Sequence, residues 1–213
     1  DQSYVLYDLT QEKLARVKFP LGTFCKTDAR EIAEQAGLVN AHKHDSQDIC
    51  FVPDGDYARV IEQHTGRASE PGPFLDLQGN VIGQHRGIIH YTVGQRRGLA
   101  MPSDGKLYVV RILPEQNAVV IGPNEALFSR ECLVSRMHWI SGQTPALPLR
   151  CSAKTRYRQP EKPCTVYPAE NGCVRLVFDE PLRAMTPGQS AVLYDGEIVL
   201  GGGIITREEA APC

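Results

Sequence analysis

The stretch AVLYDGEIVLGGGIIT, residues 191–206, decides the fold class because it has the features of a β-hairpin. Two apolar runs, Ala191–Tyr194 and Ile198–Thr206, flank the dipeptide Asp195-Gly196. Such a dipeptide favours the tight turns of hairpins, since these turns need positive backbone φ angles. Asn171-Gly172 has the same character between two earlier apolar runs. We therefore predict two antiparallel hairpins in the C-terminal part of the chain.

Further short apolar runs extend this β pattern upstream as far as Pro71. Strands are predicted over residues 107–113, 118–121, 132–140, 149–157, 164–168 and 174–178. The first two of these are expected to pair across Pro114–Asn117. Strands that recur at short spacing with turn residues between them are typical of a small barrel or a sandwich.

The pattern changes before residue 71. Capping residues and a 3.6-residue apolar period predict three helices, over residues 10–17, 27–36 and 57–64. Residues 3–7 alternate like a strand, and residues 49–52 form a short apolar strand signal. We expect an α+β fold that is mostly β: a short α/β segment followed by a β-rich part that forms a small barrel or a sandwich.

Composition excludes several classes of protein. The chain has 213 residues, of which 42% are hydrophobic, and a formal net charge of −2, so nothing demands a polyanionic partner. There is no apolar run of about 18 residues, so we expect no membrane-spanning helix. No leader is visible, and the first residues open in mid-pattern without a Met, which suggests a piece of a longer protein. Seven cysteines without a C-x-x-C pair argue against a disulfide framework and a zinc site, and favour a reducing cytoplasm.

Cys50 is the strongest candidate for chemistry. It follows the polar stretch Asp45-Ser46-Gln47-Asp48 and has His42 and His44 nearby in sequence. A nucleophilic cysteine needs hydrogen-bond donors or positive charge around its thiolate, and solvent access. The alternative is an inert cysteine in a short buried strand.

Two basic segments are candidates for binding. Lys154, Arg156 and Arg158 would share one face of a strand beside Tyr157, an arrangement that suits phosphate contacts and base stacking. A solvated edge strand explains the same pattern. The pair Arg96-Arg97 lies between glycines, and an ordinary structural loop is the alternative there.

Two other patterns carry no function by themselves. Gly201-Gly202-Gly203 lies inside a predicted strand, so a bulge or close packing is expected there rather than a phosphate loop. The spacing of Asp76, His85 and His90 fits no standard metal site, so no metal is expected.

Several stretches together resemble one family, the MnmA-type tRNA-specific 2-thiouridylases. The most specific stretch is Asp45–Phe51, which ends in Ser-Gln-Asp-Ile-Cys-Phe. The others follow in the family's order: Asp1–Tyr4, Phe19–Gly22, Gly87–Leu99, Arg156–Gln159, Asp179–Pro181 with Ala184, Thr186–Gln189 and Leu200–Ile205.

The resemblance implies an ATP-dependent enzyme that replaces the 2-oxygen of the wobble uridine of tRNA with sulfur. Cys50 falls on the cysteine that carries the persulfide, which a sulfur-carrier protein loads. Asp1, Gln2, Arg156, Tyr157 and Gln189 fall on tRNA-contacting positions. The Arg96-Arg97 pair lies within the family motif Gly87–Leu99.

The resemblance also implies limits. The family's Ser-Gly-Gly-x-Asp-Ser loop for ATP and its second cysteine, which attacks the persulfide, are not in this sequence. Cys25 falls where the family has no catalytic cysteine. The fold that the resemblance implies has three parts: residues 1–55 as the α/β end of the ATP domain, 56–142 as a small central β-rich domain and 143–213 as a C-terminal antiparallel β-barrel. The chain alone is expected to be inactive and monomeric. A tRNA-docking module with an inert Cys50 is the alternative.

Overall fold

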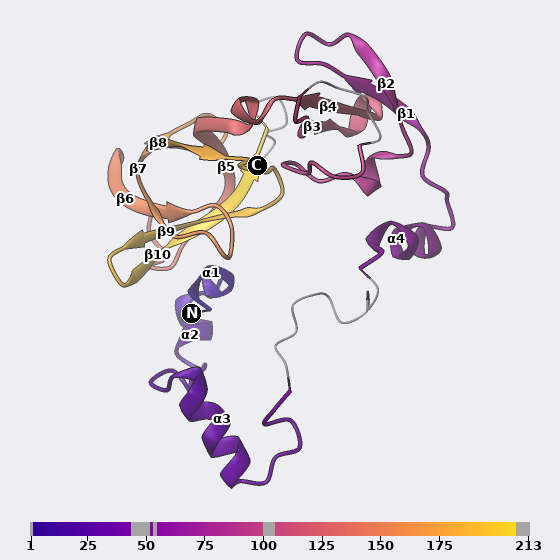
Figure 1. Ribbon diagram of the computed structural model, residues 1–213. Coiled ribbons are helices and arrows are strands. Elements are labelled where there is room, and N and C mark those ends of the chain that lie inside the picture. Colours follow the sequence, from indigo (N-terminus) through magenta and orange to yellow (C-terminus); the bar gives the residue numbers. More distant parts are fainter. Residues whose placement is uncertain (1, 44–51, 53–54, 100–104, 208–213) are drawn as a thin grey trace. The chain divides into compact units, whose positions relative to one another are not determined.

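The computed structural model describes residues 2–43, 52, 55–99 and 105–207 (Figure 1). The chain forms two compact units, one of residues 1–11 with 69–213 and the other of residues 12–68. The larger unit holds all the β structure of the described residues, and each unit is described by itself below.

A closed six-stranded barrel forms the C-terminal part of the larger unit (Figure 1). Its strands are β5 (Phe128–Trp139), β6 (Leu149–Lys154), β7 (Lys162–Pro168), β8 (Val174–Arg183), β9 (Ser190–Asp195) and β10 (Ile198–Thr206). They close in the order β10-β5-β8-β7-β6-β9, and every neighbouring pair is antiparallel. The hairpins predicted at Asn171-Gly172 and Asp195-Gly196 are confirmed, as β7–β8 and β9–β10.

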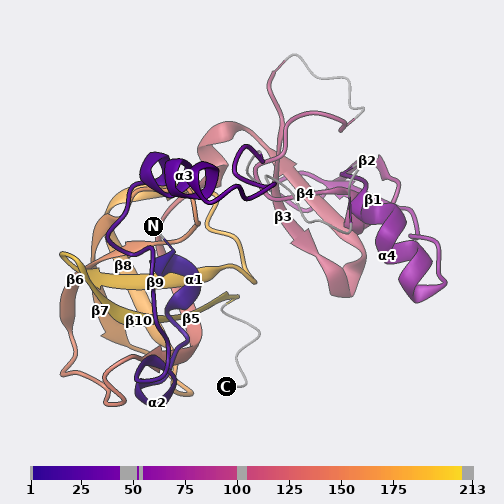
Figure 2. The same cartoon turned by 90° about the horizontal axis from the view of Figure 1, so that it is seen from below.

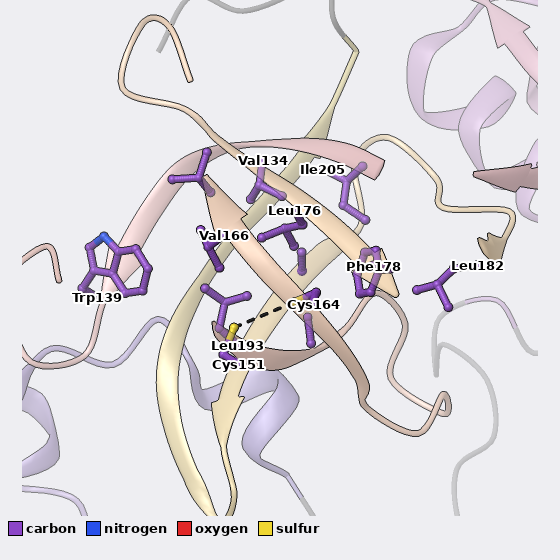
Figure 3. Packing of buried hydrophobic residues seen from close by; sticks show 13 residues of the cluster. Val134, Trp139, Cys151, Cys164, Val166, Leu176, Phe178, Leu182, Leu193 and Ile205 are labelled. Carbon is purple, nitrogen blue, oxygen red and sulfur yellow. Dashed lines mark hydrogen bonds between the residues drawn. The ribbon is translucent and has the colours of Figure 1, made fainter. Parts of the chain in front are cut away.

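The barrel interior is filled by side chains that alternate along the strands (Figure 3). Leu176 and Phe178 of β8, Val166 of β7 and Leu193 of β9 are almost completely buried. Trp139 is also part of this core. Inward-facing apolar residues at a period of two are what a closed small barrel requires, so the alternation fixes which face of each strand points inward.

A four-stranded sheet precedes the barrel. Its strands are β1 (Gly72–Leu75), β2 (Val81–His85), β3 (Tyr108–Leu113) and β4 (Ala118–Gly122), in the order β2-β1-β4-β3. β3 and β4 pair as predicted, antiparallel across the short 3-10 helix Pro114–Gln116. β1 and β4 are parallel, and Phe74 and Val119, which pair between them, lie in the core of this sheet. Two more 3-10 helices cover Ile88–His90 and Asn124–Leu127.

Residues 3–6 form the short helix α1 (Ser3–Leu6), so the prediction of a strand there was wrong. The helix lies beside β9 and β10 of the barrel (Figures 1 and 2). Its hydrogen bonds to the barrel come from side chains, and Tyr4 Oη donates to the carbonyl of Ser190 at 2.7 Å. Tyr4, Leu6 and Tyr7 are therefore partly covered by docking on the barrel and not by pairing in a sheet, whereas Val5 stays exposed.

The triple glycine of β10 makes room for this docking. A Cβ at position 202 would lie 2.7 Å from both the Ala191 carbonyl oxygen and the ring of Tyr7. A Cβ at position 201 would lie 2.1 Å from the His138 carbonyl oxygen, and the strand register shifts at this point. The predicted bulge and close packing are confirmed.

The smaller unit is helical in its described residues. α2 (Gln11–Leu14), whose first residue still belongs to the larger unit, is shorter than the helix predicted over residues 10–17. α3 (Lys26–Gln35) and α4 (Tyr57–Thr65) agree with the predictions. Asp56 caps α4 through its carboxylate, which accepts from the backbone N–H of Arg59. The strand predicted over residues 49–52 falls almost wholly outside the described residues.

Candidate nucleic-acid interface

The basic segment after β6 forms a turn instead of a strand. β6 ends at Lys154, and the backbone N–H of Gln159 donates to the carbonyl of Arg156 at 3.2 Å. Thr155 is buried, and its hydroxyl donates to the side-chain oxygen of Gln159 at 2.9 Å. The prediction that Lys154, Arg156 and Arg158 share one strand face was therefore wrong, because this local hydrogen bonding ends the strand.

Arg156 is half-buried, and its guanidinium is held against the protein. Its Nη2 donates to the carbonyl of Ala184 at 2.5 Å and to the hydroxyl of Thr186 at 3.3 Å. Its Nε is buried without a hydrogen-bond partner. Burial lowers the pKa of the guanidinium, and the nearby charge of Arg183 lowers it further. The guanidinium thus fastens the turn after β6 to the segment between β8 and β9.

Tyr157 is the exposed aromatic residue of this turn, with 47% of its surface accessible. Its ring meets the ring of Tyr4 of α1 edge to face, with the centroids 5.9 Å apart. Burial raises the pKa of the Tyr4 hydroxyl, with further contributions from Tyr7 and Tyr194, so this group stays a neutral donor. A supported but exposed ring is a suitable platform for a stacked base.

The docking of α1 brings the N-terminal residues to the same part of the barrel. Tyr4 Oη donates to Ser190, the residue that follows Gln189. The Ser3 hydroxyl lies 3.2 Å from the Tyr194 hydroxyl, and the Ser190 hydroxyl donates to the Tyr7 hydroxyl at 3.2 Å. Gln2 precedes α1 and is exposed, whereas Asp1 lies outside the described residues.

Gln189 is exposed at the start of β9, and its backbone is fixed on both sides. Its N–H donates to the carbonyl of Thr186, and its carbonyl accepts from the N–H of Ile205 at 2.8 Å. Ala184, in the same segment, has a positive φ of 55°, a conformation that costs free energy in a residue with a side chain. The N–H of Ala184 donates to the carbonyl of Leu127 at 2.7 Å, which holds the residue in place.

Four of the five tRNA positions expected from the resemblance are therefore described, and they belong to three converging segments. Residues 2–7, 154–159 and 184–190 are linked by the hydrogen bonds and the ring contact given above. We call the exposed parts of these three segments the rim surface. Its cations include Lys154, whose ammonium lies 4.9 Å above the ring of Tyr194, and the exposed Arg158. Positive charge beside an exposed ring can hold a phosphate next to a stacked base.

Tyr4 was not singled out by sequence reasoning, although it links two of the three segments. Its neighbours in the motif Asp1–Tyr4 were the available signal. The pair Arg96-Arg97 is exposed in a loop, and Arg183 Nη2 donates to the carbonyl of Gly94 in that loop at 3.4 Å.

Cys50, His44 and the motif around them lie outside the described residues. His42 is described, and its Nε2 lies 3.4 Å from a carboxylate oxygen of Glu34 in the same unit. Cys25 is exposed at the start of α3. Among the described residues no cluster of three or more histidine, cysteine or acidic side chains could hold a metal ion.

The described residues do not fit ATP. A triphosphate needs backbone N–H groups of a glycine-rich loop that leads into a helix. The glycine-rich stretch of the described chain, Gly201–Gly203, lies within β10 and is filled on both faces by neighbouring backbone and side chains. The described residues therefore provide no binding site for the triphosphate of ATP. No helix of the described chain is long and apolar enough to cross a membrane.

Comparison with protein families matches three domain models in succession along the chain. A tRNA methyl transferase HUP domain matches residues 1–54, a tRNA methyl transferase PRC-barrel domain matches residues 58–123, and an aminomethyltransferase β-barrel domain matches residues 129–205.

Curated relatives are similar over nearly the whole chain. The tRNA-specific 2-thiouridylase MnmA of Acetivibrio thermocellus is 50% identical over 96% of this chain and 57% of its own length. The MnmA proteins of Symbiobacterium thermophilum and Clostridioides difficile are 47% and 44% identical over 97% of this chain, and over 53% and 57% of their own lengths. The chain thus spans little more than half the length of these relatives.

The three domain types in this order place the chain among proteins built from the tRNA methyl transferase set of domains. Within that set, the chain belongs to the MnmA-type tRNA-specific 2-thiouridylase family. The predicted fold class, mostly β with a C-terminal barrel, is confirmed, and the segment expected to be the end of an ATP domain is matched by the HUP domain.

Proposed function

We propose that this chain is the tRNA-docking and sulfur-carrying part of a tRNA 2-thiouridylase, with Cys50 as the persulfide cysteine. Gln2, Arg156, Tyr157 and Gln189 contact the tRNA, together with Asp1. The sulfur comes from a persulfide carrier protein, and ATP, bound elsewhere in the whole enzyme, activates the uridine oxygen as a leaving group. The division at residues 55/56 and 142/143, a monomeric state and a cytoplasmic location belong to the same proposal.

The observation that carries this proposal is the convergence of three distant segments on the rim surface. Tyr4 and Ser190, which are hydrogen-bonded, are 186 residues apart in sequence. The three segments expose a tyrosine ring, two cations and two glutamines, whose side chains can stack on bases and bind phosphate or base edges. The names of the curated relatives give the substrate class, tRNA.

The four described residues have different roles in binding. Tyr157 supplies a stacking face, while the side chains of Gln2 and Gln189 supply both hydrogen-bond donors and acceptors. Arg156 holds the turn against the segment of Thr186, so its charge acts on phosphate from a fixed position. A preorganised surface of this kind loses less conformational entropy when it binds.

Cys50 would act as a covalent carrier. Its thiolate attacks the outer sulfur of a donor persulfide, a new S–S bond forms at Cys50, and the donor leaves as a thiolate. No net oxidant is needed, because the outer sulfur passes between thiols with its oxidation state unchanged. The reaction requires that the Cys50 thiol ionises near neutral pH.

Persulfide mapping tests the carrier role. The folded chain is incubated with a low-molecular-weight persulfide, its thiols are blocked, and the added sulfur is located by mass spectrometry. Cys50→Ser should lose the added sulfur, whereas Cys25→Ser, which removes an exposed thiol outside the motif, should keep it. Sulfur on Cys25 in place of Cys50 would refute the carrier role and leave a tRNA-docking module.

Binding of tRNA is tested separately, by fluorescence anisotropy with labelled tRNA at several salt concentrations. We expect saturable binding that weakens with salt, because phosphate contacts release counterions. The double variant Tyr157→Ala, Gln189→Ala should bind weakly. Unchanged affinity of this variant, with the barrel still folded, would refute the rim surface as the binding site.

A further inference from the structure

Two buried cysteines of the barrel lie opposite each other on neighbouring strands. Cys151 of β6 pairs directly with Cys164 of β7, and their sulfur atoms are 3.8 Å apart (Figure 3). Cys164 is fully buried, and Cys151 is 9% exposed. Their thiols form one weak S–H···S hydrogen bond inside the core of the barrel.

This placement suits a disulfide without movement of the backbone. Directly opposed residues of antiparallel strands have Cβ atoms about 4.5–5.5 Å apart, close to the spacing of about 3.5–4.5 Å in disulfides. The two sulfur atoms must approach from 3.8 Å to a bond length of about 2.05 Å. Rotation of the two side chains about χ1 can provide most of this approach.

We propose that Cys151 and Cys164 form a dithiol site that is converted reversibly into a disulfide by a low-molecular-weight disulfide. The Cys151 thiolate attacks one sulfur of the oxidant, and one thiolate of the oxidant leaves. The Cys164 thiolate then attacks the Cys151 sulfur of this mixed disulfide and expels the second thiolate. The two cysteine protons pass to the two leaving thiolates, so the oxidant is reduced by two electrons and the protein loses two.

Cys151 is the attacking residue for three structural reasons. It is the more exposed of the two thiols. It follows Arg150, whose positive charge favours a thiolate, and the Cys164 thiol can donate to that thiolate. β6 pairs with β9 only over Ser152–Lys154, so at Cys151 the strand pairs with β7 alone and opens on that side more easily.

The bond would tie together the two strands of the β6–β7 hairpin at the middle of their ladder. The closed loop runs from residue 151 to residue 164 and includes the turn with Arg156 and Tyr157. Oxidation would therefore limit the opening of the hairpin that carries two of the four described tRNA positions, Arg156 and Tyr157. The formation of the bond itself does not depend on the proposed function.

Disulfide mapping of the full 213-residue chain tests the proposal. The folded chain is incubated with oxidised glutathione until exposed Cys25 is fully modified, the remaining thiols are blocked in denaturant, and the protein is digested with trypsin. Trypsin releases Cys151 on residues 151–154 and Cys164 on residues 159–175, a peptide that also holds Cys173. Fragmentation of the linked peptides distinguishes Cys164 from Cys173.

We expect one internal link, Cys151 to Cys164, which dithiothreitol reverses. Cys173→Ser removes the other buried thiol of that peptide and should leave the link intact, whereas Cys164→Ala should leave glutathione on Cys151. Oxidation of the wild-type chain already decides the matter if a variant does not fold. The proposal would be overturned if Cys151 and Cys164 both remain free thiols after Cys25 has reacted. Disulfide links among several other cysteines would also overturn it.

Discussion

Replacement of Tyr157 by alanine should weaken the binding of tRNA about tenfold. Stacking of one base on an aromatic side chain contributes about 1–3 kcal/mol. Tyr157 exposes 47% of its surface, and one edge already packs against Tyr4, so about half of the ring surface is left for a base. We therefore take the lower part of this range, ~1.4 kcal/mol, which corresponds to about a tenfold change in Kd.

The assay is a titration of labelled tRNA with each variant at a fixed, low salt concentration. Tyr167→Ala is the matched control, because Tyr167 is a 42% exposed tyrosine at the end of β7, outside the rim surface. Tyr4→Phe keeps the supporting ring but loses the hydrogen bond to Ser190, so it should weaken binding less than Tyr4→Ala. Tyr4→Ala should weaken binding by a few fold because the edge-to-face pair contributes ~0.5–1.5 kcal/mol.

Two results would refute the reasoning. If Tyr157→Ala and Tyr167→Ala weaken tRNA binding equally, any exposed tyrosine of the barrel contributes to affinity and the rim surface is not a specific binding site. If Tyr157→Ala binds like the wild type while Arg158→Ala does not, the surface binds phosphate only, and the ring has no stacking partner.

Three further predictions concern stability. Phe178→Ala should lower the free energy of unfolding by about 3–5 kcal/mol in urea titrations, because a ring that is 1% exposed leaves a cavity in the barrel core. Gly202→Ala should lower the melting temperature, because its Cβ would meet the ring of Tyr7 at 2.7 Å. It should also lower the fluorescence anisotropy of a probe at residue 2, since α1 would be held less firmly on the barrel. Burial lowers the pKa of His85, so below about pH 6.5 the unfolded chain binds a proton more readily than the folded chain. The free energy of unfolding should therefore fall as the pH decreases, by at most ~1.4 kcal/mol per pH unit. His85→Gln should remove this part of the pH dependence.

Most of the β part of the fold could be predicted from local sequence, although β1 and β2 were not among the predicted strands. β10, β9 and the turns at Asn171-Gly172 and Asp195-Gly196 were located correctly because period-two alternation and positive-φ turn residues act over a few residues. The predictions failed where contacts with distant residues or a local turn determine the backbone conformation. The sequence of α1 alternates like a strand, yet the side chains of Ser3 and Tyr4 form hydrogen bonds with β9, almost two hundred residues away in sequence.

The candidate site was predictable as a set of residues but not as an arrangement. Arg156, Tyr157 and Gln189 were identified through a family resemblance, while alternation alone placed Arg156 on an exposed strand face. The buried hydroxyl of Thr155 ends that strand and turns Arg156 toward Ala184. A hydrogen bond to a backbone carbonyl so distant in sequence leaves no periodic signal.

The sequence by itself determined where most of the β-strands lie and the family of the chain, because alternation, turn residues and motifs are local properties. Only the tertiary structure decided how the barrel closes, where α1 docks, and that Tyr4, Tyr157 and Gln189 belong to one surface. It also decided that Cys151 faces Cys164, since strand register depends on the packing of both faces of the sheet. These outcomes depend on the burial of surfaces that meet only when the whole unit has folded.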